Sequence, residues 1–136
     1  MAINFGHLND VWGEPISLIP PDLKTPLGPI CTDSRKLEEG DFFVPLQGEH
    51  FDGHCFLQNV LNKGVQAALV SRSCPVEVPK GLLHWIVDDT LQAYQRIALL
   101  HRIQLDIPVI AVTGSVGKTT TREMIKSLLT PLGPVM

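Results

Sequence analysis

The sequence predicts an α/β protein, in which a layered domain is followed by a glycine-rich loop between a strand and a helix. Between residues 41 and 105, short apolar segments typical of strands alternate with segments whose apolar residues recur at helical spacing. After residue 107, an apolar, β-branched segment leads directly into glycines and a second amphipathic segment. We therefore expect one domain over residues 1–106, and the first strand, loop and helix of another over residues 107–136.

Composition narrows the class of protein. The 136 residues are 44% hydrophobic and 18% charged, which favours a packed core over disorder. A net charge of −3 argues against electrostatic capture of nucleic acid or of an anionic membrane. No signal peptide opens the chain, and no apolar run approaches the roughly 20 residues that span a bilayer. We expect a cytoplasmic protein.

The three cysteines are odd in number and widely spaced, without a C-x-x-C pair. This pattern favours reduced thiols over a disulfide framework or a zinc site.

The first 30 residues are rich in proline and glycine, so we expect no long regular element there. A short extended piece such as Ile16–Ile19 could still pair at the edge of a sheet.

The regular pattern begins after residue 40. Asp41–Leu46 reads as a strand, and Pro45 places it at an edge or ends it there. Cys55–Lys63 has helical spacing, with Gly64 where a helix C-terminus favours glycine. Ala67–Val70 then reads as a buried strand.

His84–Val87 predicts a further strand. Asp89 can cap a helix, with Gln92 at the position that a capping box needs. That helix should end near Leu105. It is expected to bury Leu91, Tyr94, Ile97 and Ala98. Asp106–Pro108 reads as the junction between domains.

Pro108–Thr113 predicts a buried strand of the parallel type. Gly114–Thr121 follows it and reads GSVGKTTT. Arg122–Leu129 then predicts a helix. Its expected apolar face carries Met124, Ile125, Leu128 and Leu129. The order of strand, glycine loop, Gly-Lys-Thr and helix is the one that a phosphate-binding loop requires.

The residue types of this loop suit a nucleotide phosphate. Gly114 and Gly117 let the backbone approach an anion closely, and Lys118 supplies a point charge to the β- and γ-phosphates. The Thr119 hydroxyl is the predicted Mg²⁺ ligand, with Thr120 as a second candidate. The predicted ATP phosphate site comprises Thr113, Gly114, Ser115, Val116, Gly117, Lys118, Thr119 and Thr120.

The spacing of the loop is not the general one. Val112 stands five residues before Gly117, where the usual phosphate loop has glycine, so the loop has the tighter form T-G-S-x-G-K-T-T. A simple strand-to-helix turn with a surface lysine is the alternative, and the flanking strand and helix argue against it.

This tight loop resembles that of the Mur ligase family. Four earlier segments occur in the order seen in the amino-terminal domains of its MurE and MurF branches: TDSR (Thr32–Arg35), Gly40–Leu46, Gln47–His54 and Asn62–Val70. The run GSVGKTTTREMI and the stretch GEHFDGH resemble the MurF branch most.

The resemblance implies a MurE/MurF amino-terminal, mixed-sheet domain followed by the start of an ATPase domain. It implies ATP and Mg²⁺ as cofactors, and UDP-MurNAc-tripeptide and D-Ala-D-Ala as substrates of the full enzyme. In the family reaction, ATP phosphorylates the tripeptide carboxylate, and the dipeptide amine then attacks the acyl phosphate. The residues it assigns to the UDP-substrate site are Thr32, Asp33, Ser34, Arg35, Gln47, Gly48, Glu49, Asp52 and His54.

Several of these residues have a structural alternative. Asp33 and Arg35 either meet the ligand or form an ion pair that only fixes the loop. Asp52-Gly53 either lines the site or is a turn, with His54 capping the next helix. His50 and His54 are spaced like metal ligands, but no third strong ligand accompanies them.

Alternative functions are a MurE-type ligase that adds the third amino acid, and a module that binds UDP-sugar-peptides without catalysis. By analogy with the family, catalytic groups and the D-Ala-D-Ala site lie beyond Met136. We therefore expect no ligase activity from these 136 residues alone.

Overall fold

The computed structural model describes residues 2–135. The chain divides into two compact units, residues 1–105 (unit 1) and residues 106–136 (unit 2). Among the described residues, no helix combines the length and the apolar character that a membrane crossing requires.

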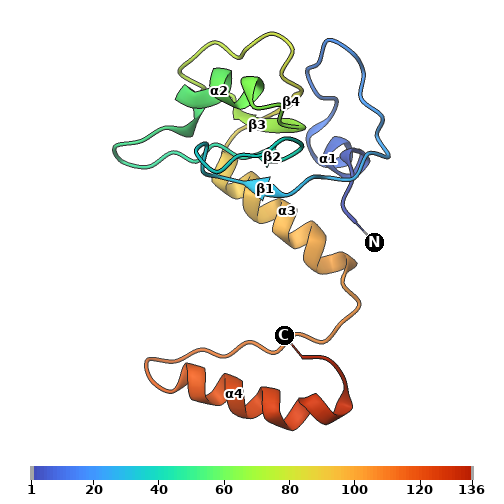
Figure 1. The fold of residues 1–136 in the computed structure, drawn as a ribbon, viewed down its shortest axis with the longest axis vertical. Helices are drawn as coiled ribbons and strands as arrows, with labels where there is room; N and C mark the ends of the chain where they lie inside the picture. Colours follow the sequence, from blue (N-terminus) through green and yellow to red (C-terminus); the bar gives the residue numbers. More distant parts are fainter. Residues whose placement is uncertain (1, 136) are drawn as a thin grey trace. The chain divides into compact units, whose positions relative to one another are not determined.

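Unit 1 is built on a four-stranded sheet with the order β1-β2-β3-β4 (Figure 1). The strands are β1 (Ile30–Cys31), β2 (Phe42–Phe43), β3 (Ala67–Ser71) and β4 (His84–Val87). All three strand pairs are parallel. The α/β class is confirmed, and the antiparallel part of the expected mixed sheet is a single bridge between Ile16 and His84 at the β4 edge.

Successive side chains of the inner strands enter two different cores. Phe42 and Leu69 lie in one apolar cluster with Ala93 and Ile97 of α3 (Thr90–Gln104). Phe43, Ala68 and Val70 lie in a second cluster with α2 (Leu57–Asn62). Figure 1 shows α2 and α3 on opposite sides of the sheet. This alternation is the two-residue period of a strand whose two faces are both covered.

Helix α1 (Phe5–Trp12) was not expected in the proline-rich start of the chain. All prolines of the first 30 residues follow Gly13, so none interrupts it. Asn4 accepts a hydrogen bond from the His7 N–H, and His7 Nδ1 accepts one from the Asn4 N–H, which closes a capping box.

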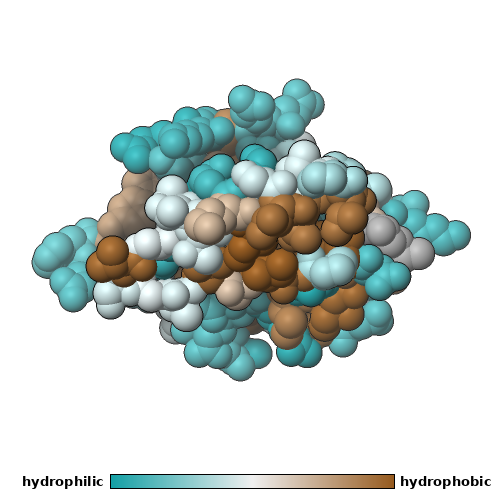
Figure 2. Space-filling view, turned by 90° about the horizontal axis from the view of Figure 1, so that it is seen from below, coloured by the Kyte–Doolittle hydropathy of each residue, from teal (hydrophilic) through white to brown (hydrophobic). Residues whose placement is uncertain are grey.

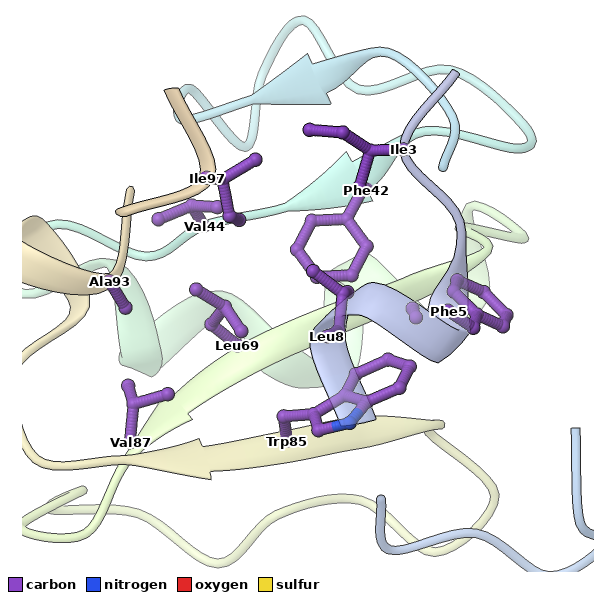
Figure 3. Close-up of a cluster of buried hydrophobic side chains, with 11 residues drawn as sticks. Ile3, Phe5, Leu8, Phe42, Val44, Leu69, Trp85, Val87, Ala93 and Ile97 are labelled. Carbon is purple, nitrogen blue, oxygen red and sulfur yellow. The ribbon is translucent and has the colours of Figure 1, made fainter. Parts of the chain in front are cut away.

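The apolar side of α1 completes the first core. Leu8 and Phe5 are 0% and 2% exposed, and the Phe5 ring lies 5.1 Å from that of Trp85. Figure 3 shows Leu8 between Phe42 and Trp85. The opening residues are therefore part of the core of unit 1.

Two of the predicted elements around β2 have other bounds. The strand expected over Asp41–Leu46 is only Phe42–Phe43, because its neighbour β1 is itself two residues long. The helix expected over Cys55–Lys63 begins as a 3-10 turn, η1 (Gly53–Phe56), and continues as α2. Gly64 follows α2 with φ of +72°, as predicted for a helix C-terminus.

The later elements of unit 1 agree with the sequence prediction. β3 and β4 lie where they were expected, and α3 begins after Asp89, whose side chain accepts from the Gln92 N–H. The predicted buried face of α3 is wrong in part: Leu91 is 51% exposed and Ala98 is exposed, while Ala93 and Ile97 are buried. The buried stripe of α3 runs along Ala93, Ile97 and the partly buried Tyr94 and Leu100.

Unit 2 contains α4 (Lys118–Leu129) and a short 3-10 turn, η2 (Thr130–Leu132). The predicted helix is confirmed and begins four residues earlier than Arg122. Residues 108–113 carry no regular secondary structure, so the predicted buried strand is wrong here. Val109 and Ile110 are each 58% exposed. A strand needs a paired neighbour for its backbone groups, and the described part of unit 2 offers none.

Candidate functional site

The carboxyl ends of β1 and β2 bring the two polar segments to one edge of the sheet. Thr32–Arg35 follows β1, and the segment to His54 follows β2, which pairs with β1 in parallel. The Val44 N–H donates to the Cys31 carbonyl at 3.0 Å, where the two segments leave the sheet. Ligands of open α/β sheets bind at this edge.

The first segment is a tight turn held by its own aspartate. The Lys36 N–H donates to the Asp33 carbonyl at 3.0 Å, and the Arg35 N–H donates to Asp33 Oδ1 at 3.1 Å. The Arg35 guanidinium also meets the Asp33 carboxylate through two bonds, Nε to Oδ1 at 2.9 Å and Nη2 to Oδ2 at 2.8 Å. The ion pair that was one alternative for these residues is therefore present.

This ion pair is exposed and carries its charge at neutral pH. The side chain of Arg35 is 86% exposed and that of Asp33 30%. The hydrogen bonds from the side chain and backbone N–H of Arg35 lower the pKa of Asp33 from 3.8 to about 2, and Asp33 in turn raises the pKa of Arg35. Because exposed pairs are weak, an incoming phosphate can compete with Asp33 for the guanidinium.

The second segment is a hairpin-like loop. Gln47 and Asp52 form an antiparallel bridge, and the Gly48 N–H donates to the Phe51 carbonyl at 2.7 Å. The residues at its tip, from Gln47 to Phe51, are exposed. Gly53 closes the loop against Pro45, and an added Cβ there would lie 2.9 Å from the Pro45 Cα. Only glycine fits this approach of two backbones.

Next to the tip, Asp52, His54 and Ser71 are linked by hydrogen bonds. His54 is 2% exposed. Its Nδ1 lies 2.6 Å from Asp52 Oδ1, and its Nε2 accepts from the Ser71 N–H at 3.0 Å. Since Nε2 accepts, the neutral ring carries its proton on Nδ1 and donates it to Asp52.

Asp52 also caps the 3-10 turn by accepting from the His54 N–H, so the cap is Asp52 and not His54 as the alternative had it. Burial acts to raise the pKa of Asp52, but the hydrogen bonds from the backbone and ring of His54 lower it below its usual value. Asp52 and His54 thereby join the loop after β2 to the end of β3.

His50 and His54 do not come together as metal ligands. Both ring nitrogens of His54 are engaged in hydrogen bonds, and His50 is exposed on the tip. No group of three or more candidate ligand residues (His, Cys, Asp or Glu) comes together within residues 2–135.

The glycine loop of unit 2 forms a helix N-terminus of the kind that binds anions. Gly114 and Gly117 have φ of +146° and +80°, a region that favours glycine. The first helical hydrogen bond of α4 is donated by Thr121 to Gly117, so the N–H groups of the preceding residues have no partner inside the helix. Lys118 Nζ donates to the Gly114 carbonyl and folds over the loop.

All eight predicted phosphate-site residues are exposed, and Thr119 and Thr120 border an open hollow of about 570 Å³ along α4. In the view of Figure 2, apolar side chains, in brown, are exposed on the surface. Unit 2 exposes Met124, Leu128 and Leu132 at 62%, 75% and 84%.

Sequence reasoning missed two residues that bind the candidate site. Ser71 contacts His54 through its backbone, and its place directly after a predicted strand could have indicated it. The ammonium of Lys63 contacts the backbone of the 34–37 segment, and no local pattern indicates such a contact.

Comparison with known proteins agrees with these features. The family model for the Mur ligase family, catalytic domain, matches residues 29–111. The UDP-N-acetylmuramoyl-tripeptide–D-alanyl-D-alanine ligase of Synechocystis is 49% identical over 107 residues, which cover 78% of this chain and 23% of the relative.

Solved structures show the same fold. The corresponding ligase of Acinetobacter baumannii superposes with a TM-score of 0.81 at 34% identity, over 98% of this chain and 29% of that one. A MurF ligase of Thermotoga maritima in complex with ADP gives a TM-score of 0.66 at 30% identity, over 76% of this chain and 23% of that one. The chain thus spans less than a third of the length of these relatives, and the matched family model covers more than half of it: the chain belongs to the Mur ligase family.

Proposed function

We propose that the chain is the amino-terminal part of an ATP-dependent ligase that joins D-Ala-D-Ala to UDP-MurNAc-tripeptide in the cytoplasm, during peptidoglycan synthesis. The observation that carries the proposal is that both polar segments leave neighbouring parallel strands at the carboxyl edge of one sheet. The relatives that share this sheet bear the name of that ligase.

In this proposal unit 1 holds the UDP end of the substrate. Arg35 exchanges part of its contact with Asp33 for a diphosphate oxygen, since a guanidinium matches phosphate and carboxylate alike. The exposed tip supplies Gln47, whose amide offers a donor and an acceptor to the uracil edge, together with Gly48 and Glu49. Thr32 supplies a hydroxyl, and the buried Ser34 and His54, with the partly buried Asp52, support these groups.

Unit 2 begins the ATP site. The positive-φ glycines, the helix N-terminus and the exposed Lys118 fit a nucleotide phosphate, and the Thr119 hydroxyl fits a Mg²⁺ ligand. Thr113, Ser115, Val116 and Thr120 supply the rest of the cradle. ATP would provide the phosphoryl group that activates the substrate carboxylate. The ADP complex of the Thermotoga relative supports the nucleotide class.

Calorimetric titration of the 136-residue chain with UDP-MurNAc-tripeptide tests the UDP site. We expect saturable binding that Arg35→Ala weakens about tenfold or more, because a charge-assisted contact is lost. Arg96→Ala, at an exposed arginine on α3, is the matched control and should leave the affinity unchanged. Equal affinity for GDP, or no saturable binding, would refute the assignment of unit 1.

Ligase activity should be absent from these 136 residues alone, since neither unit contains a residue assigned to the D-Ala-D-Ala site. A coupled assay for ADP release that depends on D-Ala-D-Ala measures it. Sustained turnover in that assay would contradict the expectation that these 136 residues alone are inactive.

A further inference from the structure

Lys63 connects the end of α2 to the turn that carries Arg35. Its Nζ donates to the carbonyl of Ser34 at 3.0 Å, of Arg35 at 3.1 Å and of Leu37 at 3.4 Å. An ammonium group has three N–H donors and no acceptor, so these three carbonyls use all of them. The contact spans 26 to 29 residues of sequence.

The surroundings of Lys63 hold the ammonium in place. Lys63 is the C-cap residue of α2, and a helix C-terminus favours a cation. Leu37, at the far end of the contacted segment, is 6% exposed and packs in the second core, which fixes that end. The turn is therefore bound at its start by Asp33, at its end by Leu37 and along its carbonyls by Lys63.

Lys63 also leaves a positive charge beside the turn. Within residues 2–135 it forms no ion pair with a carboxylate, and backbone carbonyls carry no net charge to cancel it. Arg35, by contrast, is paired with Asp33. A cation fixed beneath the turn both orders its backbone and favours an anion above it.

We propose that Lys63 is a positioning residue of the UDP site: it fixes the Ser34–Leu37 backbone so that Arg35 meets the diphosphate of the sugar nucleotide. This inference rests on the proposed function of unit 1. Lys63 acts through the turn and does not itself touch the ligand.

Titration of the chain with UDP-MurNAc-tripeptide tests the inference. Lys63→Met should weaken binding about tenfold, and Lys63→Arg, which restores the donors and the charge, should return it to within about threefold. Lys36→Met is the matched control, because Lys36 lies in the same turn and is exposed. It should weaken binding less than about threefold.

A double-mutant cycle separates positioning from general loosening. In the Arg35→Ala background, Lys63→Met should have little further effect on affinity, since the group that it positions is gone. Unfolding midpoints measured by circular dichroism accompany each variant. If Lys63→Met lowers the midpoint strongly, Lys63→Gln, which keeps two donors, takes its place in the cycle.

The outcomes are distinct. If the unaltered chain binds no UDP-MurNAc-tripeptide, the proposed function and this inference both fail. If it binds, and Lys63→Met weakens it no more than Lys36→Met or by the same factor with and without Arg35, only the inference fails. A tenfold loss that Lys63→Arg rescues and that disappears without Arg35 supports it.

Discussion

The two units of the chain bury their apolar side chains to very different extents. In unit 1, Phe42, Leu69 and Trp85 are 0% exposed, whereas Met124 and Leu128 of α4 are 62% and 75% exposed in unit 2. Both units nevertheless contain well-formed helices. The difference shows that glycines and helix propensity suffice for the local geometry of the glycine loop and its helix, while burial requires a sheet with both faces covered.

Replacing Trp85 by alanine should give the largest loss of stability, because Trp85 joins α1 to the sheet at the centre of the first core. We expect Trp85→Ala to lower the free energy of unfolding by about 3–5 kcal/mol. The matched change in unit 2, Met124→Ala, should lower it by less than about 0.5 kcal/mol. Urea unfolding followed by circular dichroism measures both. Similar losses of unfolding free energy for the two variants would contradict the difference in burial between the units.

Gly53→Ala should give the next largest effect, since its new Cβ would press on the Pro45 backbone at 2.9 Å. Neither backbone can move freely, so the expected loss is about 2–3 kcal/mol, as for overpacking in a core. Gly48→Ala in the same loop is the control, because its nearest neighbour would be the Phe51 carbonyl at 3.9 Å. Thermal unfolding distinguishes the two variants. An unchanged unfolding midpoint for Gly53→Ala would show that the backbone around Gly53 and Pro45 can move apart to admit a Cβ.

Gln66 tests whether polar contacts also tie the start of unit 1 to its sheet. Its Oε1 accepts from the Gly28 N–H and its Nε2 donates to the Pro26 carbonyl, each at 2.8 Å. Gln66→Ala should therefore cost about 1 kcal/mol and speed hydrogen exchange at Gly28. Gln95→Ala, on the exposed side of α3, should change neither quantity. Unchanged exchange at Gly28 would mean that apolar packing alone holds this segment.

The elements that could be predicted are those fixed by neighbours in sequence. β3, β4 and α3 follow from apolar runs and the Asp89 cap, all within a few residues. Helix α1 was missed because its capping box uses His7 in place of the usual Glu or Gln. The strand over residues 108–113 was wrong because pairing is a property of the neighbours and not of the segment.

The candidate site divides in the same way. The glycine loop could be derived from its own residues, because backbone N–H groups and glycine conformations are local. The two polar segments were assigned to a UDP site through resemblance, and sequence reasoning missed the residues that support them. Ser71 and Lys63 lie 17 and up to 29 residues from the groups that they contact, so only the fold brings them together.

The smallest expected effect on stability concerns the exposed turn at Asp33. This turn belongs to unit 1, but like the loop of unit 2 it is held by contacts between residues close in sequence. The pKa of Asp33 is about 2 in the folded chain, below its usual value of 3.8. A depressed folded pKa means that the ion pair stabilises the fold above about pH 3.8 and ceases to do so as the pH falls toward 2. Exposure keeps this contribution small.

An NMR titration of the Asp33 carboxyl carbon measures that pKa directly. Arg35→Met should raise the midpoint toward 3.8, because the side-chain hydrogen bond from Arg35 is the largest cause of the shift, while the bond from the backbone N–H of residue 35 remains. Lys36→Met should move it much less, since Lys36 acts only through charge at a distance. A midpoint that stays near 2 without Arg35 would show that the turn is organised from unit 1 and not by its own aspartate and arginine. The exposed turn, like the buried core, would then be organised by residues distant in sequence. Lys63 would be the first group to examine as the source of the pKa shift.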